Sequence, residues 1–81
     1  MSDTDKPELK RFVVSVATDV ILEGRHWFSP DRSWAALDLD FISAPDSDTA
    51  EAIAAYKVLK FRREETPLAR ILIQGIDSKE L

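Results

Sequence analysis

Three carboxylates have the type and spacing that acid–base or metal chemistry needs. Asp38 and Asp40 lie two residues apart in a segment that alternates apolar and polar residues. A strand there would project both from one face, roughly 7 Å apart. Glu23 belongs to the segment that would pair with this strand, so the trio could hold a hard cation or act as acid and base. A solvated strand face produces the same spacing, so we predict no metal site and keep a metal-dependent enzyme as the weakest alternative.

Nucleophilic and phosphate-binding chemistry finds little support. A Ser-His-Asp triad would have to use His26, the sole histidine, and no serine lies in the glycine-flanked setting of a nucleophile elbow. The chain has no cysteine, and its two glycines, Gly24 and Gly75, are too far apart for a phosphate-binding loop. We therefore predict a protein that is not an enzyme, with no catalytic residue and no cofactor.

Four basic residues form a second candidate site. Cations near the end of a helix complement its dipole, and the run is followed at once by Glu64 and Glu65. The net charge of -4 argues against duplex binding as the main role, because that role normally needs a basic surface. A nucleic-acid-binding accessory protein is the second alternative, and it would use Lys57, Lys60, Arg62 and Arg63.

Both tryptophans fall within one short stretch of aromatic and basic residues. Trp27 and Trp34 are accompanied by Arg25 and Arg32, and tryptophan and arginine are enriched in interface hot spots. An opposed tryptophan pair could also simply stabilise a hairpin. We predict that this tip and the adjoining sheet face bind a protein partner or a second copy, through Trp27, Trp34, Arg25, Arg32, Ile21 and Ile42.

A long β-hairpin would position these residues. Residues 10–28 alternate with period two and are rich in β-branched residues, which predicts a strand over 11–28 with a bulge at Gly24. Ser29 and Pro30 favour a type I turn over 29–32, and a return strand follows over 33–43.

The apolar faces of the two strands suggest their register. With Phe28 opposite Ser33, Leu22 faces Leu39, and Trp27 faces Trp34. A slip of two residues keeps the same faces and sets Arg25 opposite Asp38, so both registers stay open. In either register the odd-numbered apolar residues of the return strand face the core.

A helix and a last strand complete the chain. Asp48 and Glu51 have capping-box spacing, which predicts a helix over 49–64. Its apolar residues form two stripes, so either two sides are contacted, or the helix stops near Tyr56 and 58–63 is strand. Pro67 ends the element, and 68–76 reads as a strand.

This order predicts a single small α+β domain of the type β-β-α-β. A mainly antiparallel three-stranded sheet, in the order 2-1-3, would carry the helix on one face, over residues 10–76. Residues 1–9 would be a flexible acidic tail and 77–81 a polar tail. The expected core is Phe12, Val14, Val16, Val20, Leu22, Leu37, Leu39, Phe41, Ile53, Tyr56, Leu59, Ile71 and Ile73.

The uncovered sheet face and the composition together suggest a function. A sheet face without a second layer must be solvated or covered by a partner. The absence of cysteine, a polar N-terminus and the lack of an apolar run of ~20 residues favour a cytoplasmic location without membrane contact. We predict a small binding or regulatory protein that acts by protein–protein contact or self-association.

Overall fold

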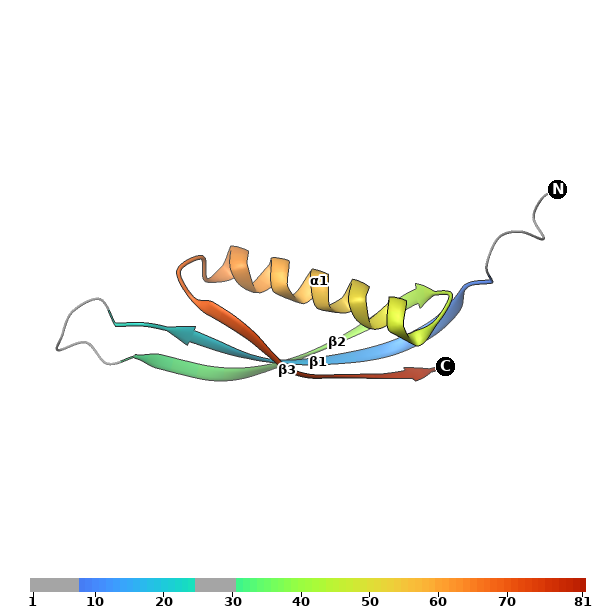
Figure 1. Cartoon of the computed structure of the whole chain (residues 1–81), viewed down its shortest axis with the longest axis horizontal. Coiled ribbons are helices and arrows are strands. Elements are labelled where there is room, and N and C mark those ends of the chain that lie inside the picture. The colour runs from blue at the N-terminus through green and yellow to red at the C-terminus, as the bar shows by residue number, and fades with distance from the viewer. Residues whose placement is uncertain (1–7, 25–30) are drawn as a thin grey trace.

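The computed structural model describes residues 8–24 and 31–81. They form β1 (Lys10–Leu22), β2 (Arg32–Ala44), α1 (Ser47–Glu65) and β3 (Arg70–Glu80). The strands make one antiparallel sheet in the order β2-β1-β3, and α1 lies across one face of it (Figure 1). The predicted α+β class, strand order and single helix layer are confirmed. We call the covered side of the sheet the helix face and the other side the open face.

Alternation along β1 decides which of its side chains are buried. The even-numbered residues from Phe12 to Val20 lie on the helix face and are at most 4% exposed. The odd-numbered residues from Val13 to Ile21 lie on the open face and are half-buried, because β1 is the central strand. Four expected core residues are therefore confirmed, namely Phe12, Val14, Val16 and Val20.

The register of β2 against β1 differs from both predicted registers by an odd number of residues. Leu22 pairs with Arg32 instead of Leu39, and Val20 pairs with Trp34. An odd slip turns every side chain of a strand to the opposite face. The odd-numbered residues of β2 consequently lie on the open face, and the expected core positions of Leu37, Leu39 and Phe41 are wrong.

A longer connection than a tight turn separates the two strands. Residues 23–31 lie between β1 and β2, and the Gly24 amide donates a hydrogen bond of 2.8 Å to Asp31 Oδ1 across this connection. β1 ends at Leu22, so the strand expected to reach residue 28 is shorter. The predicted turn at Pro30 lies outside the described residues.

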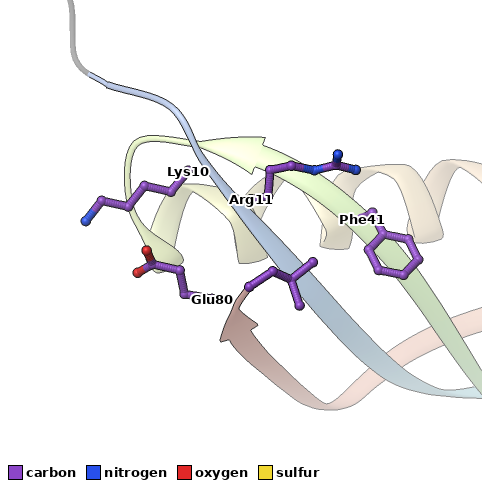
Figure 2. A pocket seen from close by; sticks show the side chains of 5 residues that line it. Lys10, Arg11, Phe41 and Glu80 are labelled. Atoms are coloured by element: carbon purple, nitrogen blue, oxygen red, sulfur yellow. The ribbon is translucent and has the colours of Figure 1, made fainter.

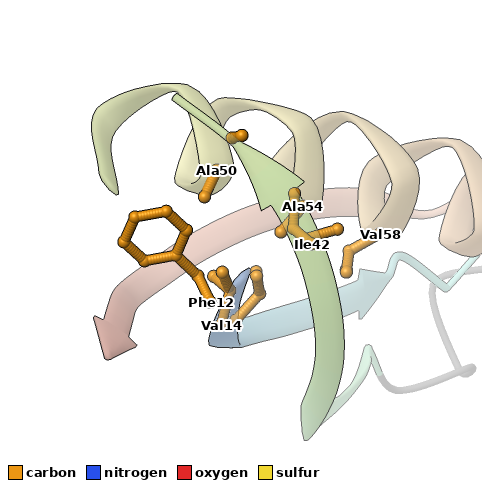
Figure 3. Close-up of a cluster of buried hydrophobic side chains, with 8 residues drawn as sticks. Phe12, Val14, Ile42, Ala50, Ala54 and Val58 are labelled. Atoms are coloured by element: carbon orange, nitrogen blue, oxygen red, sulfur yellow. The ribbon is translucent and has the colours of Figure 1, made fainter. Parts of the chain in front are cut away.

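Small residues bring α1 close to the sheet. Ala50, Ala54 and Val58, spaced one helical turn apart, are buried against Phe12 and Ile42 (Figure 3). The opposite stripe faces solvent: Tyr56 is 67% exposed, so its expected core position is wrong. The predicted Ile53 packs partly buried against this core, and Leu59 and Ile71 are half-buried.

The helix ends are capped by residues of the chain. Asp46, rather than the predicted Asp48, is the N-cap, and its Oδ1 accepts a hydrogen bond of 2.8 Å from the Thr49 amide. This hydrogen bond lowers the pKa of Asp46 below its ordinary value. The helix continues to Glu65, so the alternative of a strand over 58–63 is wrong.

The last strand is longer than predicted and contains a bulge. β3 continues to Glu80, so residues 77–80 are strand and not a polar tail. Gly75 pairs with Ala17 and Ile73 with Thr18, which leaves Gln74 as the extra residue of a bulge. The bulge expected at Gly24 is absent, because β1 ends before it. Ile73 is 38% exposed and not part of the core. Residues 1–7 of the expected acidic tail are outside the described part of the chain.

Candidate protein-binding surface

The open face carries a row of large apolar side chains along one edge of the sheet. Leu37, Leu39 and Phe41 of β2 are 68%, 67% and 62% exposed. They point away from α1 because their pairing partners, Ala17, Ser15 and Val13, lie on the same open face. We call Leu37, Leu39 and Phe41 the β2 ridge. An edge strand with large exposed apolar residues is a feature that monomeric proteins usually avoid.

Beside the ridge lies a row of short side chains. Ser15 and Ala17 of β1 lie next to Leu39 and Leu37, and Gly75 of β3 pairs with Ala17. We call Ser15, Ala17 and Gly75 the small-residue track. A Cβ atom added at Gly75 would have nothing within 4 Å, so the space above this backbone is open.

Two hollows adjoin these rows. One, of about 150 Å³, lies on the open face and is lined by Val13, Ser15, Leu39, Asp77, Ser78 and Lys79. A second, of about 580 Å³, lies at the sheet corner where β3 ends (Figure 2). Its apolar lining residues are Phe41 and Leu81, and its charged ones are Lys10, Arg11 and Glu80. The surface is thus apolar along β2 and shallowly hollowed beside it.

The charges on the open face are mixed in sign. The pairing of β1 with β2 and with β3 gives their positions. Arg11 lies next to Ser43, Lys79 next to Val13, and Asp77 next to Ser15. Asp19 and Arg70 are located toward the other end of the face. With Glu23, which pairs with Arg70, three cations and three anions lie on this face, so it lacks the acidic excess of the whole chain.

The predicted binding residues do not gather on one surface. Ile21 lies half-buried on the open face, but Ile42 is 4% exposed beneath α1, so its predicted place in a contact surface is wrong. Trp34 is 41% exposed and pairs with Val20 on the helix face. Arg32 is exposed at the start of β2. Arg25, His26 and Trp27 lie outside the described residues.

The acidic trio is divided between two places. Asp38 and Asp40 lie on the helix face, where Asp38 Oδ2 is 2.6 Å from Arg62 Nη2 and Asp40 Oδ2 is 3.8 Å from Lys57 Nζ. Glu23 instead pairs with Arg70 at 3.5 Å. Within the described ranges 8–24 and 31–81, no group of three His, Cys, Asp or Glu side chains is placed to hold a metal ion. The geometry does not assemble the site that the spacing suggested.

The basic run is also divided. Arg62 turns toward the sheet and also contacts Glu65 at 3.0 Å. Burial alone would lower the pKa of Arg62, but hydrogen bonds to Asp38 and Glu65 outweigh it and raise this pKa. Lys60 and Arg63 lie on the outer surface of α1, where they line a hollow of about 330 Å³ with Tyr56, Leu59 and Glu64. Two of the four cations are thus already paired with acidic residues.

The β2 ridge is the part of the surface that sequence reasoning placed wrongly. A signal for the correct orientation existed: Asp38 and Asp40 alternate with the ridge residues, and Lys57 and Arg62 are spaced to meet them from a helix. Opposite charges on facing elements favour the orientation that pairs them.

Comparisons of the chain with protein-family models, with curated proteins and with solved structures find no match. No helix in the described part of the chain is long and apolar enough to cross a membrane.

Proposed function

We propose that this protein is a small non-catalytic binding protein that acts by protein–protein contact through its open face. The observation that supports this proposal most strongly is the β2 ridge, whose three large apolar side chains are each more than 60% exposed. Fully burying a leucine or phenylalanine side chain stabilises a complex by roughly 1.5–3 kcal/mol. A partner that covers the ridge would therefore gain several kcal/mol from these residues alone.

The character of the face favours a protein over a nucleic acid. Contact with phosphates needs a concentration of cations, but Lys57 and Arg62 are paired with acidic residues and the net charge is -4. The open face combines apolar side chains with charges of both signs, as the core and rim of a protein interface do. The predicted tip residues Arg25 and Trp27 could extend this contact, but the proposal does not depend on them.

Two matched substitutions test the proposal. Leu39→Asp places a charge in the ridge, whereas Leu68→Asp makes the same change at a leucine of almost equal exposure, 66%, in the α1–β3 connection. In affinity capture from an extract of the source cells, with an untagged copy of the chain also present, wild type and Leu68→Asp should retain the same protein. Leu39→Asp should lose it.

The readout distinguishes a specific contact from background binding. Capture that depends on Leu39 and is indifferent to the change at Leu68 supports the proposal. If every captured protein, including the untagged copy, is retained equally by Leu39→Asp, the open face is not the binding surface and the proposal is wrong. Circular dichroism should show that both variants keep the wild-type secondary structure, because both positions are exposed.

A further inference from the structure

We propose that the occupant of the open face is a second copy of this chain, in a symmetric dimer that packs the two open faces together. In this arrangement the β2 ridge of each copy lies over β3 of the other, with Leu37 above Gly75 of the small-residue track. The inference rests on the proposed function, since it names the partner for the same surface. Three observations carry it: the shape of the face, its area and its charges.

The shape of the face is complementary to itself. The ridge lies at one edge of the sheet, and the track lies on the middle strand and the opposite edge. A two-fold axis parallel to β1 turns one copy over, so that its β2 lies above β3 of the other copy and the two β1 strands face each other. Because this rotation keeps each residue at its level along the strands, Leu37 of one copy then lies over Gly75 of the other, while Leu39 and Phe41 lie over Asp77 and Lys79. The same contacts occur in both halves, as an isologous interface requires.

The track has room for what the ridge brings. Nothing lies within 4 Å of a Cβ built on Gly75, and the neighbouring hollow at Ser15 has a volume of about 150 Å³. An aliphatic side chain from Leu37 or Leu39 of the second copy can therefore enter this space without displacing the backbone.

The area of the face is sufficient for a dimer. With strands of 13 residues in β1 and β2 and three strands in the sheet, the face measures about 43 Å by about 14 Å. That is roughly 600 Å² for each copy, or about 1,200 Å² in total, which reaches the lower limit of stable specific interfaces. The two sheets would stack about 10 Å apart, with an α1 layer on each outer side.

The charges of the face permit two identical copies to approach. The whole chain has a net charge of -4, so two copies repel each other at long range. The charged residues of the open face are Arg11, Arg70, Lys79, Asp19, Asp77 and Glu23, the partner of Arg70, which makes three cations against three anions. Because this face is nearly neutral, the acidic residues elsewhere do not prevent it from meeting its own copy.

Sedimentation equilibrium of the purified full chain over a wide concentration range tests the dimer. Wild type and Leu68→Asp should sediment as dimers, and Leu39→Asp should be a monomer. Gly75→Gln fills the track with a long uncharged side chain and should weaken the dimer about tenfold to hundredfold, as overpacking of a contact does. Gly75→Ala adds a single methyl group and should dimerise like the wild type.

Gly75→Gln is informative because it should leave the monomer intact. The position has no positive φ, and a Cβ atom built there meets no atom within 4 Å. Glycine weakens a strand, so replacement should hold or raise the stability of the fold. If the circular dichroism of Gly75→Gln nevertheless shows lost structure, Ser15→Gln obstructs the same track from β1 and takes its place.

The outcomes separate this inference from the proposed function. A wild type that stays monomeric at all concentrations overturns the dimer, whereas Leu39-dependent capture of another protein would still support the binding function. If Leu39→Asp disrupts the dimer but Gly75→Gln and Ser15→Gln leave it intact, the placement of β2 over β3 is wrong. A dimer that all of these substitutions leave intact overturns the use of the open face.

Discussion

Thr18 is the one buried polar side chain among the residues that the structure describes. It is 1% exposed on the helix face of β1, and its Oγ1 has no hydrogen-bond partner there. Its neighbours in the buried row, Val16 and Val20, are equally buried but apolar. A hydroxyl that loses water without gaining a partner reduces stability, so Thr18 is a weak point of the core.

Thr18→Val should therefore stabilise the protein. Valine has the same shape and the same β-branching, so the packing is kept while the unpaired hydroxyl is removed. We expect the free energy of unfolding to rise by about 1 kcal/mol, measured by urea denaturation at one fixed protein concentration. The reverse change at the preceding buried position of β1, Val16→Thr, should lower the free energy of unfolding by about 1–3 kcal/mol. A loss of stability in Thr18→Val would show that the hydroxyl is hydrogen-bonded after all.

At the level of elements, α1 is held to the sheet by two kinds of contact. Near its start, Ala50 and Ala54 are fully buried and allow close approach to the sheet. Near its end, Arg62 replaces apolar packing with an ion pair to Asp38, in which the arginine side chain is 12% and the aspartate side chain 28% exposed. The pairs of Arg62 and Lys57 also explain why β2 turns two carboxylates toward the helix.

Arg62→Met should destabilise the fold because it leaves Asp38 half-buried without its cation. We expect a loss of about 1–3 kcal/mol, between the costs of breaking a surface pair and a buried pair. Adding Asp38→Leu should recover most of this loss, since replacing both partners by apolar residues is often neutral.

Lys57→Met serves as the matched control for the ion pair. Its pair with Asp40 is longer, 3.8 Å, and the lysine side chain is 58% exposed, so the change should cost less than about 1 kcal/mol. Chemical denaturation of the wild type, Arg62→Met, Asp38→Leu and the double variant measures the coupling between Arg62 and Asp38. Equal losses for Arg62→Met and Lys57→Met would contradict the special role of Arg62.

At the scale of the whole molecule, residues 8–24 and 31–81 form two layers, so these residues leave one large sheet face uncovered. The buried apolar core consists of nine described residues, three of which are alanines, so the core of a single copy is thin. A chain of this length buries only about 60% of its unfolded surface, and its stability is correspondingly modest. A second copy on the open face would add an apolar layer of nearly the length of the sheet.

Thermal unfolding should accordingly depend on protein concentration. If the open faces associate, mass action raises the Tm by about 3–6 °C for each tenfold increase in concentration. The Tm of Leu39→Asp should be independent of concentration, whereas Leu68→Asp should behave like the wild type. Differential scanning calorimetry over a hundredfold range measures this, and a constant wild-type Tm would contradict dimerisation.

Local patterns in the sequence were sufficient to predict the architecture. Period-two alternation along residues 10–22, the acidic helix start near Asp46 and the stop at Pro67 produce the observed order of elements. The central position of β1 followed from its length and from the helix between the last two strands. These features depend on neighbours within a few residues, and alternation in particular needs no knowledge of the partner strand.

The candidate site was predicted less well. The uncovered sheet face was expected and is present, but only Ile21 of its predicted residues lies on it among those described. Ile42 was assigned to that face and is buried, whereas the ridge residues Leu37, Leu39 and Phe41 were assigned to the core and are exposed. All these errors have one cause, an odd slip in the register between β1 and β2.

The sequence by itself determined that β2 has two distinct faces, and only the tertiary structure decided which of them α1 covers. Both faces contain apolar residues: the ridge on one, and Ile42 and Ala44 on the other. Hydrophobicity therefore does not choose between them strongly. The choice depends on groups distant in sequence, because Ile42 and Ala44 fit beneath the small residues of α1 while Asp38 reaches Arg62. That arrangement satisfies the carboxylates and leaves the ridge on the open face.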